Sequence, residues 1–189
     1  MKQRFVAITS ILVLLLSLAA CTRNSDKTEI ANLNEAKVSV SLPASFFADH
    51  PPEEVIAAYA EEKGITASVN EDGSYTLTMF KAQHDEQMSE MRQGIKESFS
   101  EMAADETGII KEIKHNDHFS DITIVVNRAD YENDFLAAVS VGTAVFVCGL
   151  QGWMYNLFNG TKDPKITINI QDANSGKIIH STIYPDGYA

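Results

Sequence analysis

The sequence predicts an α+β fold, with one antiparallel sheet of about seven strands and three helices on one face. Two observations predict it. Short segments of alternating apolar and polar residues come in pairs separated by turn-forming residues, and a helical pattern precedes each pair. Including one leading strand, the order is β-(αββ)3. A length of 189 residues, 44% of them apolar, suits one domain, which we place at 36–189.

The first unit follows a leading strand at Lys37–Leu42, whose sequence KVSVSL alternates strictly. A helix is expected after Pro51-Pro52, because a first helical turn does not need the missing N–H groups. Gly64 suits its end. A hairpin then follows over Ile65–Met79, with its turn at Asn70–Gly73.

The second unit begins with a helix over Ala82–Ala104. Its apolar stripe has spacings of three and four and consists of Met88, Met91, Ile95, Phe99 and Met102. Its strands are expected at Ile109–Lys114 and Ile122–Asn127, on either side of a turn at Asn116–Asp121. The pattern therefore repeats that of the first unit.

The third unit begins at Asp130, a plausible N-cap, and its helix is predicted to run to about Asn159. Gly160 follows the helix end. The strands Lys165–Ile170 and Lys177–Tyr184 then form the last hairpin.

The third helix allows two interpretations. No charged residue occurs from Phe135 to Thr161, so residues 135–158 could cross a bilayer. Crossing would separate the last hairpin from the other strands, and an isolated hairpin is marginally stable in water. We therefore favour a core helix buried nearly all round, and keep a membrane-spanning sensor subunit as an alternative.

Residues 1–20 have the form of a signal peptide. Lys2 and Arg4 precede a short apolar run, and Leu18-Ala19-Ala20-Cys21 resembles the lipobox of bacterial lipoproteins. That resemblance implies cleavage before Cys21 and a palmitate-type diacylglyceryl thioether on its sulfur. The polar segment 21–35 is then a flexible tether, with the domain on the extracytoplasmic face of the cell membrane.

The acidic composition and the cysteine count restrict the partners and the chemistry. A formal net charge of −11 argues against a nucleic-acid partner. Because lipid occupies Cys21, Cys148 has no disulfide partner in the chain, and its apolar setting predicts a small buried residue.

One local cluster resembles a metal site. His115, Asp117, His118 and Asp121 could bind a divalent ion, but they lie in a predicted turn, where Asn and Asp serve the backbone. The sequence thus favours a solvated turn, and no cofactor is expected. An envelope hydrolase that uses surface carboxylates or the His115/His118 cluster remains an alternative function.

The polar side of the predicted sheet is the candidate binding surface. Small hydroxyl residues recur at every second strand position, so they should project from one face. Ordinary solvation explains them, and an open face of hydroxyls could also receive a protein or a glycan. These residues are Ser39, Ser41, Thr66, Ser68, Thr76, Thr78, Thr123 and Thr167.

Five stretches carry a resemblance to a known group of proteins. They are Ser41–Phe47, Asn70–Ser74, Ile113–Asp117, Tyr131–Asn133 and Tyr184–Asp186. With them the chain resembles small uncharacterised lipoproteins of Gram-positive gut bacteria, some labelled as containing an antigen I/II N-terminal domain. The resemblance implies a surface location and brings no catalytic residues. The predicted function is a lipid-anchored, non-enzymatic binding module of the cell envelope.

Overall fold

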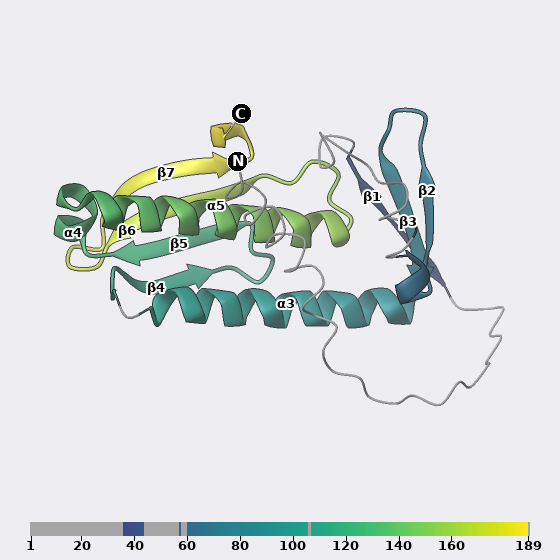
Figure 1. The fold of residues 1–189 in the computed structure, drawn as a ribbon, viewed down its shortest axis with the longest axis horizontal. Helices are drawn as coiled ribbons and strands as arrows, with labels where there is room; N and C mark the ends of the chain where they lie inside the picture. Colours follow the sequence, from purple (N-terminus) through teal and green to yellow (C-terminus); the bar gives the residue numbers. More distant parts are fainter. Residues whose placement is uncertain (1–35, 44–56, 58–59, 106, 189) are drawn as a thin grey trace, which may run out of the picture. The chain divides into compact units, whose positions relative to one another are not determined.

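The computed structural model describes residues 36–43, 57, 60–105 and 107–188, and residues 36–189 form one compact unit (Figure 1). The predicted signal peptide, Cys21 and the tether at 21–35 lie outside the described residues. So does most of the first predicted helix. Ala57 and residues 60–63 are helical, and the chain turns at Gly64, as predicted.

Seven strands are described, and they form two sheets rather than the single predicted sheet. The three-stranded sheet has the order β1-β3-β2, and the four-stranded sheet has the order β4-β5-β6-β7. Figure 1 shows the four-stranded sheet alongside α5 and the three-stranded sheet near the C-terminal end of that helix. The strands are β1 (Lys37–Leu42), β2 (Thr66–Val69), β3 (Tyr75–Phe80), β4 (Ile110–His115), β5 (Asp121–Val126), β6 (Ile166–Asp172) and β7 (Ile178–Tyr184).

The four-stranded sheet is mixed, which corrects the prediction of a wholly antiparallel sheet. Strands β5 and β6 pair in parallel, with Ile122 beside Ile168 and Ile124 beside Ile170. A long helical connection joins these two strands, and such a connection returns the chain to the same end of the sheet. The hairpins β4–β5 and β6–β7 are antiparallel, as their short turns predict.

The helical segment of the third unit is divided in two. Helix α4 (Arg128–Asn133) precedes α5 (Phe135–Phe158), and Asp134 between them has extended backbone angles. The Asp134 carboxylate accepts hydrogen bonds from the backbone N–H groups of Leu136 and Ala137, so it caps α5. Asn127 caps α4 in the same way, and the predicted cap Asp130 lies inside the first turn of α4.

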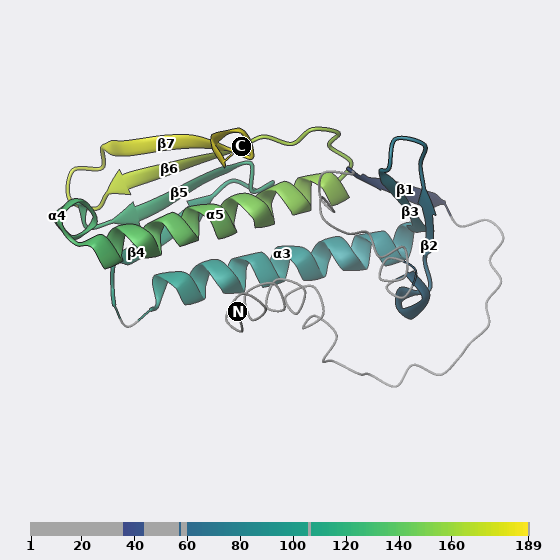
Figure 2. The same ribbon diagram turned by 45° about the horizontal axis from the view of Figure 1, so that its top comes forward.

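Helices α3 (Lys81–Ala103) and α5 lie side by side against the four-stranded sheet (Figure 2). The side of the sheet that faces them is aliphatic, and Ile122, Ile124, Ile166 and Ile168 are fully buried there. These residues belong to one core cluster, which extends through the C-terminal half of α5 to the buried side of the three-stranded sheet.

The two halves of α5 differ in burial, which corrects the prediction of a helix buried nearly all round. Residues 152–158 are all buried, because α3 and both sheets surround them. In the N-terminal half, Phe135 is 79% exposed and Leu136 is 72% exposed.

Helix α5 is also the one helix of the described residues that is long and apolar enough to span a membrane, a property that buried core helices share.

Candidate binding face

The outward side of the three-stranded sheet carries six hydroxyl residues in two rows across the strands. The first row pairs Ser39 of β1 with Thr78 of β3 and Thr78 with Thr66 of β2. Adjacent strands lie about 4.8 Å apart, and same-face positions along a strand lie about 6.7 Å apart, so the hydroxyls form a regular grid. We call these six residues the hydroxyl face: Ser39, Ser41, Thr66, Ser68, Thr76 and Thr78.

Three of the six hydroxyls make no hydrogen bond within the part of the chain that the structure describes. The hydroxyls of Ser41, Thr66 and Ser68 have no hydrogen-bond partner among the described residues, and all three residues are exposed. The Ser39 and Thr78 hydroxyls are hydrogen-bonded to each other, with 3.1 Å between the oxygens. The open hydroxyls therefore lie on the two outer strands, Ser41 on β1 and Thr66 and Ser68 on β2, on either side of the central strand β3.

The Thr76 hydroxyl belongs to a network in the β2–β3 turn. The amide nitrogen of Asn70 donates to the Thr76 hydroxyl at 3.0 Å and to the Ser74 hydroxyl at 2.8 Å. The Asp72 carboxylate accepts from the Ser74 hydroxyl and from the Ser74 backbone N–H, and these bonds lower the pKa of Asp72. Gly73 has φ of 78°, a left-handed conformation that glycine tolerates.

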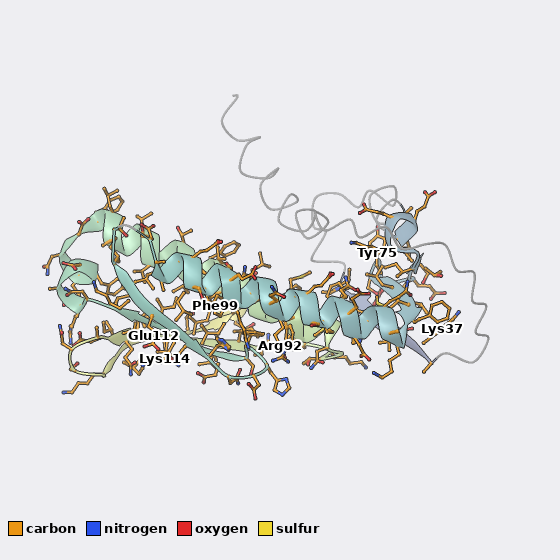
Figure 3. All side chains as sticks on the ribbon, turned by 90° about the horizontal axis from the view of Figure 1, so that it is seen from below. Lys37, Tyr75, Arg92, Phe99, Glu112 and Lys114 are labelled. Carbon is orange, nitrogen blue, oxygen red and sulfur yellow. The ribbon has the colours of Figure 1, made fainter. Side chains whose placement is uncertain are left out.

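A cation and an aromatic ring extend the hydroxyl face at one end. Lys37 and Phe80 are paired across β1 and β3, two positions before Ser39 and two after Thr78. The Lys37 ammonium lies 5.7 Å from the centre of the Phe80 ring, and Phe80 is 38% exposed. Figure 3 shows Lys37 and Tyr75 at the same end of the molecule. Both sugars and peptides can stack on an exposed aromatic ring such as that of Phe80.

The reverse side of the same sheet is buried. Val40, Leu42, Tyr75, Leu77 and Met79 are each less than 5% exposed and belong to the core cluster. Since side chains alternate along a strand, anchoring these residues holds the hydroxyl face outward in one register.

Thr123 and Thr167 are not part of this face. They lie half-buried on β5 and β6, on the side of the four-stranded sheet that points away from the helices. In that sheet Thr123 has Lys114 and Asn169 as neighbours, and the Ser181 hydroxyl donates to Asn169. The eight predicted residues therefore form two separate surfaces, because strand alternation cannot tell which strands share a sheet.

The four residues of the predicted metal cluster are not grouped as the ligands of one metal ion would be. The His115 ring contacts the Phe119 ring, with centroids 4.6 Å apart, and its Nδ1 lies 2.9 Å from the Asn116 carbonyl oxygen. The backbone carbonyls of Asp117 and His118 accept bonds from Arg92 and Asn156. Across the described ranges, no three His, Cys, Asp or Glu side chains are grouped as metal ligands would be. Asp121 is the first residue of β5.

Sequence reasoning missed the cluster that holds this turn. Arg92 of α3 donates to the Asp117 carbonyl oxygen at 2.9 Å and to the Tyr155 hydroxyl, and its guanidinium lies over the Phe119 and Tyr155 rings. Phe99 makes an edge contact with Phe119. Figure 3 shows Arg92 and Phe99 along α3, close to β4. These groups use their polar atoms to join elements of the fold, so we assign them a structural role.

Cys148 is fully buried on α5, as predicted. Burial raises the pKa of its thiol to about 12, which leaves it protonated at neutral pH and unsuited to nucleophilic chemistry.

Comparisons with known proteins identify no relative. No protein-family model matches the chain, and neither the curated proteins nor the solved structures contain a significant match.

Proposed function

We propose that this chain is a lipid-anchored, extracytoplasmic binding module and that its hydroxyl face binds a glycan of the cell envelope. The single observation that carries the proposal is the set of exposed hydroxyls on the two strands that flank β3, Ser41 on β1 and Thr66 and Ser68 on β2, which have no hydrogen-bond partner among the described residues. The lipobox at Leu18–Cys21 supports the anchor.

The chemistry of the face favours a polyhydroxylated ligand. Each Ser or Thr hydroxyl can donate one hydrogen bond and accept others, which matches the hydroxyls of a sugar. Phe80, at the end of the grid, offers an apolar ring to one sugar face. Protein-binding surfaces instead concentrate several large aromatic or Arg anchors at their centre, and the grid contains none.

Binding is tested with purified cell-wall polysaccharide and the triple variant Ser41→Ala/Thr66→Val/Ser68→Ala. These changes remove no hydrogen bond among the described residues, so the fold should persist while affinity falls at least tenfold (a loss of about 1.4 kcal/mol). The matched control is Thr123→Val/Thr167→Val, which removes two hydroxyls from the other sheet. Equal binding by the triple variant, or binding lost only in the control, contradicts the proposed face.

The anchor is tested separately by labelling growing cells with an alkyne analogue of palmitate. The unsubstituted chain and Cys148→Ser should carry the label, whereas Cys21→Ser should carry none. Label on Cys21→Ser, or its absence from the unsubstituted chain, would contradict lipid attachment at Cys21 without bearing on the glycan site.

A further inference from the structure

Strand β2 is an outer strand of the three-stranded sheet, and the hydrogen-bond pattern fixes which of its backbone groups point outward (Figure 1). The Asn70 N–H donates to the Ser74 carbonyl oxygen at 2.8 Å across the β2–β3 turn. In an antiparallel pair, residues that exchange hydrogen bonds alternate with residues that do not. Ser68 therefore bonds to β3. The backbone N–H and C=O groups of Ala67 and Val69 point the other way, and we call these four groups the β2 edge.

The pattern on the far side of β3 agrees with this assignment. The Lys81 N–H donates to the Ala36 carbonyl oxygen at 2.8 Å, and alternation from that bond makes Leu77 exchange its backbone hydrogen bonds with Val40 of β1. Leu77 is the residue of β3 that lies opposite Ala67, so its backbone groups are directed away from Ala67. The β2 edge thus has no hydrogen-bond partner among the described residues.

A groove of about 490 Å³ runs along this edge. Its lining includes Ala67 and Val69 from the reverse side of β2 and Ser68 from the hydroxyl face, so it follows the edge between the two sides. Ala60 and Glu61 of the preceding helical segment form the opposite wall. Many edge strands carry a charged residue or Pro that blocks pairing, and the sequence of β2, TASV, has neither.

We propose that the β2 edge binds an extended peptide segment of another protein, which adds to the sheet as an antiparallel strand. The N–H and C=O groups of Ala67 and Val69 recur at about 6.7 Å along the strand, and an extended peptide repeats its own groups at the same spacing. This site uses backbone groups and the groove, so it is additional to the glycan site on the hydroxyl side chains.

Strand geometry determines which side chains suit the peptide. Residues opposite Ala67 and Val69 would project to the reverse side of the sheet, where the groove has apolar walls, so branched apolar residues fit there. The residue opposite Ser68 would project beside the hydroxyl face, where a polar strand-forming residue such as Thr is suitable.

Charge favours a basic peptide. Glu61 lines the groove and forms no ion pair with a described residue. It lies in the helical turn just before Ile65, so we expect Lys or Arg at the peptide position opposite Ile65. The same charges disfavour pairing with the β2 edge of a second copy, because both edges would carry acids. The charged residues that flank β2 are Glu61, Glu62, Lys63, Glu71 and Asp72.

The probe is the peptide Val-Thr-Val-Thr-Lys, amidated at its C-terminus and labelled with fluorescein at its N-terminus. It is titrated with the purified full chain in nonionic detergent, and binding is measured by fluorescence anisotropy. The matched control peptide carries an N-methyl group on each Val nitrogen. It keeps every side chain and loses the two N–H groups that would donate to the β2 edge, so its affinity should be about tenfold lower or less.

Two substitutions locate the site on the chain. Ala67→Pro removes an N–H that points away from β3, so the internal ladder persists, which circular dichroism checks, while affinity for the probe falls about tenfold. Glu61→Gln should weaken binding of the Lys peptide about fivefold and leave binding of Val-Thr-Val-Thr-Gln unchanged. Glu90→Gln, at an exposed position of α3, is the control for the loss of one negative charge.

Amide hydrogen exchange of the full chain, followed by NMR, gives a readout at the edge itself. The Ala67 and Val69 amides should exchange fast in the free chain and become protected when the probe is added, whereas the Ser68 amide should be protected in both states. If the Ala67 and Val69 amides are already protected without peptide, another segment occupies the edge and the proposal fails.

The remaining outcomes also overturn the proposal. Absence of saturable binding of the Lys peptide up to about 1 mM shows that the edge does not accept a strand. Equal affinity of the N-methylated peptide rejects strand addition, and unchanged binding by Ala67→Pro places the peptide elsewhere. Equal or tighter binding of a peptide with Glu in place of Lys rejects a basic partner. The triple variant of the hydroxyl face keeps the β2 edge and should still bind the probe, so failure of the glycan proposal is seen separately.

Discussion

Gly152 of α5 lies directly against the backbone carbonyl oxygen of Phe119 in the β4–β5 turn. A Cβ at Gly152 would come closer to that oxygen than the 3.0 Å that real Cβ atoms keep. Phe119 has φ of 52°, is fully buried, and makes an edge contact with Tyr155, with ring centroids 5.0 Å apart. The absence of a side chain at one helix position thus allows the turn to pack on the helix.

Gly152→Ala should destabilise the fold by about 1–3 kcal/mol, because the new methyl group forces the turn or the helix to move. Gly142→Ala, on the same helix, meets nothing within 4 Å and should stabilise the protein by up to about 1 kcal/mol through helix propensity. Urea unfolding measures both. Equal effects of the two variants would contradict the close contact between Gly152 and Phe119.

Arg92→Met should lower the free energy of unfolding by about 1–3 kcal/mol. It leaves the Asp117 carbonyl oxygen and the Tyr155 hydroxyl without their shared donor. Lys96→Met, an exposed position on the same helix, is the matched control and should change stability by less than about 0.5 kcal/mol. If the two variants unfold at the same urea concentration, Arg92 has no role in holding the turn.

The Asp172 carboxylate makes the free energy of unfolding depend on pH in the acidic range. Its carboxylate accepts bonds from the Ser175 hydroxyl and from the backbone N–H groups of Asn174 and Ser175, and these bonds lower the pKa of Asp172 from 3.8. The folded state therefore favours the ionised form. The resulting stability is complete well above pH 3.8 and is lost as the pH falls through the lowered pKa.

Asp172→Asn should therefore be less stable than the unsubstituted chain at pH 7, and the difference should shrink as the pH falls below about 4. Asp117→Asn is the control, because the Asp117 carboxylate accepts no hydrogen bond from the described residues. Thermal unfolding from pH 7 to pH 2 measures the effect. A difference for Asp172→Asn that is constant with pH would show that the ionised carboxylate is not what holds the β6–β7 turn.

The Cys148 thiol should resist modification in the folded protein. Burial and a pKa of about 12 keep it from reacting with a thiol reagent at pH 8. The expected result is no labelling in native buffer and full labelling in urea, measured by mass spectrometry on Cys21→Ser. Rapid labelling in native buffer would mean that α5 separates from the sheet.

The periodic patterns were reliable within each element. Alternation placed Val40 and Leu42 on the buried side of β1 and Ser39 and Ser41 on the other, because side chains on a strand must alternate. The apolar stripe of α3 likewise identified Met88, Ile95 and Phe99, which are its buried residues. The division at Asp134 was missed, because one capping carboxylate inside an otherwise helical pattern changes the periodicity very little.

By itself the sequence determined the order and limits of most elements and the burial of Cys148. It also determined which hydroxyls share a side of each strand. The tertiary structure decided that β1–β3 and β4–β7 form separate sheets, that β5 and β6 are parallel, and that Thr123 and Thr167 lie away from Ser41. It also decided that Phe135 and Leu136 remain exposed. The physical reason is that periodicity records which side of an element avoids water. The choice of neighbouring strands, and how far a sheet extends over a helix, depend on packing between residues distant in the chain.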